Sequence, residues 1–102
     1  MTEQTIQKQI MIALSLSGCL VFRNNTGAVK DGDRFIRYGL CKGSSDIIGL
    51  TPSGQFLAVE VKKRTGKPTK EQLTFIDAIN EQGGIAGIAR SVEDALLLLA
   101  RK

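Results

Sequence analysis

The sequence predicts an α/β fold in which helices cover a small mixed sheet, in the order α-β-β-β-β-α-β-α. Apolar residues recur at helical spacing in three segments, and short runs of strand-forming residues lie between Gly, Pro and Asn turns. The chain has 102 residues, of which 42% are hydrophobic, enough for one core and too few for two. We therefore expect residues 1–102 to form a single domain.

The first segment is expected to be an amphipathic helix over residues 2–17. Ile6, Ile10 and Leu14 recur at the spacing of one helical face. Gly18 follows directly and is expected to end the helix.

Short apolar runs bounded by turn-forming residues predict four strands after this helix. They cover residues 19–22, 34–38, 46–50 and 56–62. Residues 24–27 and 31–33 are expected to be turns. The last two runs flank a Pro-Gly turn and are expected to form an antiparallel hairpin, and the run that is apolar on both faces is expected to be central.

The rest of the chain is expected to add a helix, a strand and a helix, over residues 70–81, 85–89 and 91–100. Thr69 and Gln72 have the spacing of a capping box, and Ser91 is expected to cap the last helix. Residues 95–100 are expected to pack in the core or, alternatively, at a dimer interface. The remaining apolar side chains expected in the core are Phe22, Phe35, Phe56, Leu73, Phe75, Ile76 and Ile79.

Composition excludes several classes of chemistry, because the chain contains no histidine. Serine and cysteine hydrolases that use histidine, zinc sites built on imidazole and nucleases with a histidine base are excluded. Cys19 and Cys41 form no Cys-x-x-Cys motif, so neither a zinc knuckle nor a redox pair is indicated. Two thiols without a secretory signal favour an intracellular location, and no apolar run is long enough to span a membrane.

Three residues form the strongest candidate site: Asp46, Glu60 and Lys62. Side chains two apart on a strand share a face, so Glu60 and Lys62 point the same way. If the hairpin loop covers residues 51–55, Asp46 lies opposite Glu60, and the two carboxylates are close enough to share a cation. A register shift of one residue would separate them. The alternative is structural: a solvated Glu–Lys pair and an aspartate that only forms a turn.

A basic segment follows this candidate site. It contains Lys62, Lys63, Arg64, Lys67 and Lys70 without an acidic residue between them. The chain as a whole carries 14 Lys and Arg against 10 Asp and Glu, a net charge of +4. This excess favours a polyanionic partner and a phosphate backbone beside the carboxylates, although a solvated loop is the alternative.

Residues 43–49, 56–62 and 69–75 together resemble the virus-type replication-repair nuclease (VRR-NUC) domain, a branch of the PD-(D/E)XK superfamily. The resemblance implies a restriction-endonuclease-like fold and a DNA endonuclease that requires Mg²⁺ or Mn²⁺ and no organic cofactor. It also implies a homodimer that acts in replication or repair on flapped, branched or Holliday-junction DNA. The expected location is the cytoplasm of a bacterial or phage-infected cell.

The same resemblance assigns roles to individual residues. Asp46 and Glu60 would be metal ligands, the Val61 carbonyl a further ligand, and Lys62 the residue that positions the attacking water. Glu3 would approach the metal, and Gln72 would support the lysine or the substrate. The residues expected to contact DNA are Arg37, Lys42, Ser44, Ser45, Lys63, Arg64, Lys67 and Lys70.

Two other classes of function compete with the nuclease. A DNA-binding module would keep the basic surface without cutting, but it would have no use for an acidic pair that repels phosphate. A protein-interaction domain should expose apolar rather than basic surface, and aromatic residues make up only 5% of the chain. Tyr38 as a recombinase nucleophile is disfavoured, because neither a histidine nor a matching arginine set accompanies it.

Overall fold

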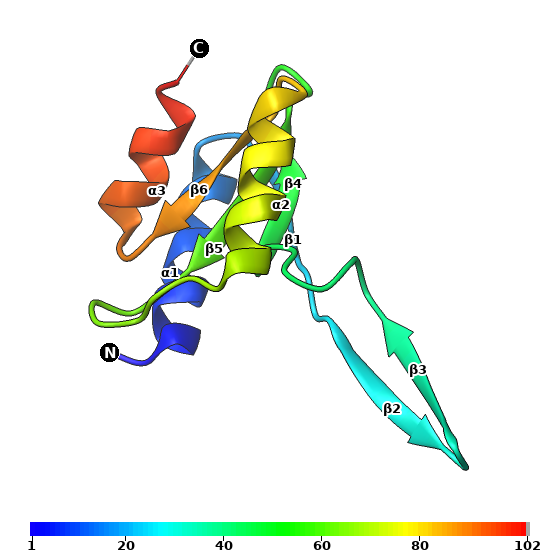
Figure 1. Cartoon of the computed structure of the whole chain (residues 1–102). Coiled ribbons are helices and arrows are strands. Elements are labelled where there is room, and N and C mark those ends of the chain that lie inside the picture. Colours follow the sequence, from blue (N-terminus) through cyan, green and yellow to red (C-terminus); the bar gives the residue numbers. More distant parts are fainter. Residues whose placement is uncertain (102) are drawn as a thin grey trace.

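The computed structural model describes residues 1–101, and over this range the chain forms three helices and six strands (Figure 1). They are α1 (Glu3–Leu16), β1 (Leu20–Arg23), β2 (Gly27–Asp31), β3 (Arg34–Tyr38), β4 (Ile47–Leu50), β5 (Phe56–Val61), α2 (Lys70–Glu81), β6 (Ile85–Ala89) and α3 (Val92–Leu99). None of these helices is both long and apolar enough to cross a membrane.

Four strands form the central sheet, in the order β1-β4-β5-β6, and β2 and β3 form a separate two-stranded sheet. The pairs β1–β4 and β4–β5 are antiparallel and β5–β6 is parallel, so the sheet is mixed and β5 is an inner strand, as predicted. In the β4–β5 hairpin Leu50 pairs with Phe56 and Ile47 with Val59, which confirms the predicted register.

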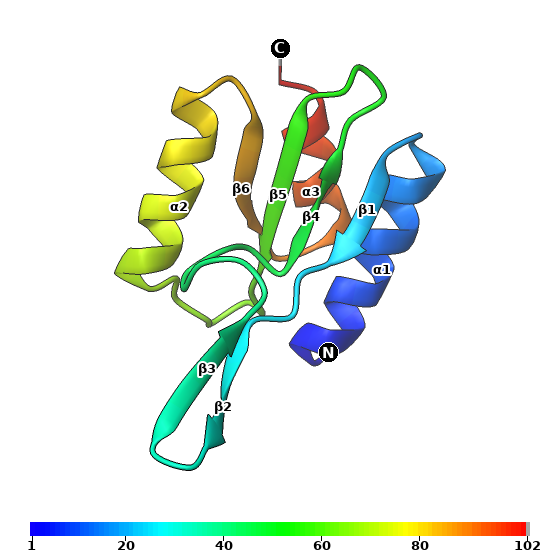
Figure 2. The same cartoon turned by 90° about the vertical axis from the view of Figure 1, so that its right-hand side faces the viewer.

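Helices cover the two faces of the sheet unequally (Figures 1 and 2). Leu57, Val59 and Val61 of β5 belong to the larger core, with α1 and α3. Ala58 belongs to the smaller core, with Ile76 of α2. Because alternate residues of a strand face opposite sides, Glu60 shares the α2 side of β5 with Ala58.

Helix α2 packs on β5 and β6, so the half of this face formed by β1 and β4 is left uncovered (Figure 2). Leu20 and Phe22 of β1 and Leu50 of β4 lie there with 55%, 52% and 41% of their surface exposed. A core position for Phe22 was therefore a wrong prediction. The last helix is also only partly internal: Ala95 and Leu98 are buried, whereas Leu97 is exposed.

The predicted element order lacks one strand, β2. Its sequence, Gly-Ala-Val-Lys-Asp, contains one strong strand former, so its conformation depends on pairing with β3 across the turn. Gly27, which the sequence assigns to a turn, pairs with Tyr38, and a Cβ there would lie 2.5 Å from the tyrosine hydroxyl. Phe35 of β3 is 72% exposed and Leu73 of α2 is 44% exposed, so their predicted core positions were wrong too.

Candidate active site

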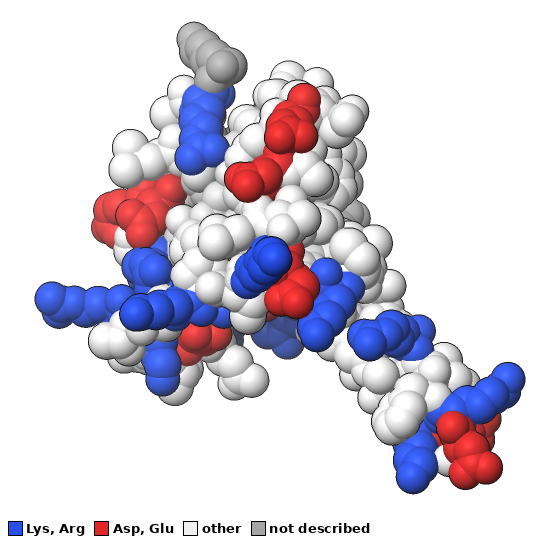
Figure 3. Space-filling view, viewed as in Figure 1, with Lys and Arg blue, Asp and Glu red and all other residues white. Residues whose placement is uncertain are grey.

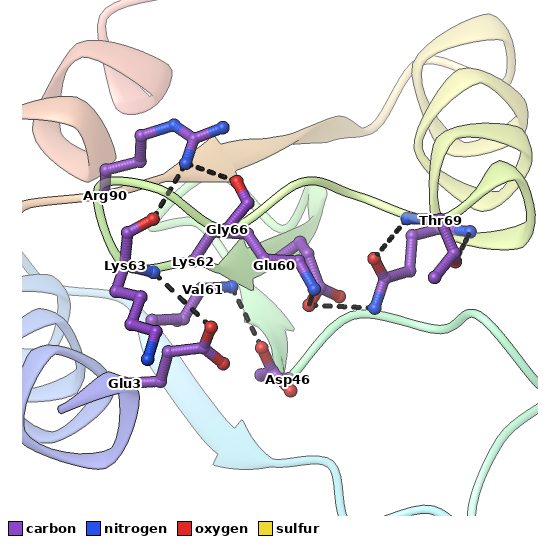
Figure 4. Close-up of polar contacts among 10 residues, drawn as sticks. Glu3, Asp46, Glu60, Val61, Lys62, Lys63, Gly66, Thr69 and Arg90 are labelled. Atoms are coloured by element: carbon purple, nitrogen blue, oxygen red, sulfur yellow. Dashed lines mark hydrogen bonds and ion pairs between the residues drawn. The ribbon is translucent and has the colours of Figure 1, made fainter.

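The two carboxylates meet where β4 begins and β5 ends (Figure 4). Asp46 immediately precedes β4, and Glu60 is the second-last residue of β5. The antiparallel register, continued by one pair beyond Ile47 and Val59, places them opposite each other on the α2 side of the sheet. The arrangement expected from the length of the hairpin loop is therefore present.

Glu60 is a buried carboxyl with one oxygen bound and the other without a partner. The residue is only 2% exposed. Gln72 Nε2 donates a hydrogen bond of 3.2 Å to Glu60 Oε2, and Lys62 Nζ lies 3.7 Å from the same oxygen. Glu60 Oε1 is buried and has no hydrogen-bond partner. Burial, followed by the charge of Asp46, raises the pKa of Glu60 to about 8, although Lys62 acts in the opposite direction.

Asp46 is held by backbone contacts from two strands. Its Oδ2 accepts a hydrogen bond of 2.9 Å from the N–H of Val61, and its carbonyl accepts one of 2.8 Å from the N–H of Asn24. The Asn24 side chain donates to Ser44 Oγ and to the Ser45 carbonyl, each at 2.8 Å. Asn24 therefore ties the end of β1 to the segment that carries Asp46.

Gln72 has two roles at the start of α2. Its Oε1 accepts from the N–H of Thr69 at 2.8 Å, and its own N–H donates to Thr69 Oγ1 at 3.1 Å, which completes the predicted capping box. Since the cap uses the amide oxygen, the amide nitrogen is available for Glu60. The same side chain thus begins the helix and orients the buried carboxylate.

Glu3 lies beside the loop that follows β5. Its Oε2 accepts from the N–H of Lys63 at 3.5 Å, and its charge is the smallest of the influences that raise the pKa of Glu60. Within residues 1–101, no group of three or more acidic or cysteine side chains lies close enough together to hold a metal ion. Asp46 and Glu60 are the two carboxylates that the sheet register brings together here.

Arg90, at the end of β6, fixes the loop that carries much of the basic segment. Its Nη1 donates to the carbonyls of Lys63 at 2.8 Å, Arg64 at 3.3 Å and Gly66 at 2.7 Å. The Lys63 and Arg64 side chains are themselves exposed. A single arginine between a strand and a helix cap carries no motif, so no local pattern marks Arg90. Asn24 lies in a segment that the sequence predicts to be a turn, and the sequence assigns its side chain no contact.

Other basic residues extend from α2 toward β3. Lys70 and Lys42 line a cavity of about 460 Å³, and Lys42 and Arg37 line a neighbouring one of about 240 Å³. Figure 3 shows basic side chains along this side of the molecule and onto the projecting strands. Ser44 and Ser45 are buried and form no part of this surface.

The oxygen donors of the site are of the kind that a hard divalent cation prefers. Oxygen is the preferred ligand of Mg²⁺, which commonly takes one or two carboxylates and fills its other positions with water and phosphate. Glu60 Oε1 is a buried acceptor that receives no hydrogen bond, and Asp46 lies beside it. A cation would compensate both the burial and the mutual repulsion of the two carboxylates.

Comparison with known proteins identifies the family and the fold. The VRR-NUC domain family matches residues 1–93. A solved structure described as a VRR_NUC domain superposes with a TM-score of 0.66 at 22% sequence identity, over 97% of this chain and 95% of that one. A search of curated proteins found no match. The central sheet is thus a nuclease-type fold, and the chain belongs to the VRR-NUC domain family.

Proposed function

We propose that this chain is an endonuclease that hydrolyses phosphodiester bonds of DNA with Mg²⁺ or Mn²⁺. Its family supports a role in DNA processing. The observation that carries the proposal is Glu60, a buried carboxyl beside Asp46 with one oxygen oriented by Gln72 and Lys62 and the other unpartnered. A structural ion pair at a strand end would be solvated on both partners, whereas the Glu60 side chain is 3% and the Lys62 side chain 13% exposed.

The residues divide the chemistry between them. Asp46 and Glu60 would hold the cation, with the Val61 carbonyl as a further ligand. The bound ion would polarise the phosphate and lower the pKa of a coordinated water. Lys62 lies beside Glu60, where its ammonium group can orient the attacking water or neutralise charge that develops on the phosphate. Gln72 keeps Glu60 in position, and Glu3 holds the loop after Lys62.

We extend the proposal to branched, flapped or Holliday-junction DNA cut by a homodimer, in replication or repair in the cytoplasm of a bacterial or phage-infected cell. One chain carries one site, so a symmetric pair can cut two strands. The uncovered half of the sheet supports a second copy as its occupant, because Leu20, Phe22 and Leu50 form an apolar patch there. Leu20→Ser with Phe22→Ser should lower the solution mass from two chains to one, as measured by light scattering.

The alternative function is a DNA-binding module that does not cut. The discriminating experiment is cleavage of labelled linear, flapped and four-way-junction DNA with Mg²⁺, Mn²⁺ or EDTA. Wild type should cut with metal, Glu60→Gln and Asp46→Asn should not, and Glu81→Gln at the far end of α2 should behave as wild type. Salt-sensitive binding without cutting under either metal would contradict the enzyme and favour the module.

A further inference from the structure

The strands β2 and β3, with the turn between them, form an arm that projects away from the central sheet (Figures 1 and 2). Residues 28–42 are all exposed. The connecting turn is Gly32-Asp33, with Gly32 at φ +63, as in the two-residue turns of tight hairpins. Isolated two-stranded hairpins are marginally stable in water, so such an arm gains order from a partner.

The two faces of the arm differ in chemistry. Cross-strand pairs place Ala28 with Arg37 and Lys30 with Phe35 on one face. We name these four residues the basic face. The opposite face carries Val29, Ile36 and Tyr38, together with the pair Asp31 and Arg34. The basic face therefore has two cations and no carboxylate among its strand residues.

The basic face continues into the surface beside the candidate active site. Arg37 lines a cavity with Lys42, and Lys42 lines the next one with Lys70. Lys70 is the first residue of α2, two positions before Gln72, which contacts Glu60. Basic residues thus lie between the start of α2 and the arm, although Glu71 lines the same cavity as Lys42 and Lys70.

We propose that the basic face of the arm binds the duplex DNA that flanks the cleavage site, an inference that rests on the proposed function. Lys30 and Arg37 contact phosphates, and Phe35, which lies opposite Lys30 and two residues from Arg37, packs its ring against the groove wall. A two-stranded β-ribbon fits the major groove of B-DNA. Five residues span about 17 Å along a strand. Against about 34 Å for one turn of DNA, the arm covers about half a turn beyond the cut.

The test is the salt dependence of binding to a fluorescent duplex of about three helical turns, measured by anisotropy in EDTA so that no metal-dependent cutting occurs. The variant is Lys30→Gln with Arg37→Gln. The matched control, Arg34→Gln with Lys8→Gln, removes the same charge from the other face of the arm and from α1. Far-ultraviolet circular dichroism confirms that both are folded.

Each phosphate contact contributes about 0.9 to the slope of log affinity against log salt. Loss of two contacts should reduce the magnitude of this slope by about 1.8. The ratio of wild-type to variant affinity for the duplex should therefore fall about twelvefold between 50 and 200 mM salt. The control should keep the wild-type slope. Equal slopes for variant and control would overturn the proposal, as would a variant that changes only the solution mass, which would assign the arm to a second copy of the chain.

The arm and the nuclease can fail separately. If wild type cuts DNA but the arm variant keeps the wild-type salt slope, the proposed nuclease function stands and the arm is not a DNA-binding surface. If wild type cuts none of the DNA panel but substitution of Lys30 and Arg37 reduces the salt slope of binding, the arm is a DNA-binding surface and the nuclease proposal is wrong. A duplex shortened by half a turn on one side should weaken wild type and leave the arm variant unchanged.

Discussion

Replacement of Glu60 by glutamine should stabilise the metal-free protein at alkaline pH. The pKa of this carboxyl is raised from 4.5 to about 8 in the folded protein, so the folded state keeps a proton that the unfolded chain releases between these values. The contribution of Glu60 is therefore fully present below pH 4.5, falls as the pH rises, and is lost above about pH 8. Glutamine has no charge to bury and does not titrate.

The magnitude follows from the size of the shift. At about 1.4 kcal/mol per pH unit, the full shift corresponds to a loss of about 5 kcal/mol between pH 4.5 and pH 8, as an upper limit. Relaxation around the charged group reduces this, and we expect Glu60→Gln to be more stable than wild type by about 2–3 kcal/mol at pH 8 and equal to it near pH 4.5.

Urea unfolding followed by circular dichroism, in EDTA at pH 4.5, 6.5 and 8, measures both curves. If the free energy of unfolding depends on pH in the same way for the two proteins, the reasoning is refuted, because Glu60 would then titrate alike in the folded and unfolded states. Mg²⁺ at pH 8 should restore stability to wild type and leave Glu60→Gln unchanged, since a ligand stabilises only the state that binds it. The metal and proton effects are thus separated in one series.

Three further predictions concern the groups around the carboxylates. Gln72→Glu keeps the capping oxygen but replaces the donor to Glu60 with a negative charge, so cleavage should fall at least tenfold while the helical signal is unchanged. Arg90→Lys should lose most of its carbonyl contacts, which limited proteolysis would detect as faster cutting at the loop after β5. Gly43→Ala should lower the free energy of unfolding by about 2 kcal/mol more than Gly54→Ala, as measured in urea. Both glycines have positive φ, but only at Gly43 would an added Cβ lie within 2.6 Å of the backbone of α2. Equal costs for the two glycines would contradict that explanation.

The elements of the central sheet were predictable because local signals agreed with tertiary packing. The capping box at Thr69 and Gln72 begins α2, and the loop over residues 51–55 fixes the pairing of Leu50 with Phe56. Since that register sets which face each carboxylate occupies, the meeting of Asp46 and Glu60 followed from counting residues alone.

What the sequence did not reveal depends on contacts between distant segments. Strand β2 has little intrinsic preference for its conformation and exists through its pairing with β3. Phe22 and Phe35 are apolar residues outside the core, because α2 covers only half of one sheet face and the arm has no layer above it. Asn24 and Arg90 act through backbone carbonyls of segments 20 or more residues away, which no local pattern encodes.

The arm joins the chain between β1 and β4, which are themselves neighbours in the sheet. Asn24 at its entrance already contacts Ser44, Ser45 and Asp46 at its exit, so the two ends are closed by hydrogen bonds independent of what lies between them. Doubling the length of such a loop costs about 0.6 kcal/mol in closure entropy. The arm itself, residues 27–38, is therefore free to lengthen, shorten or change in composition with little effect on the geometry of Asp46 and Glu60.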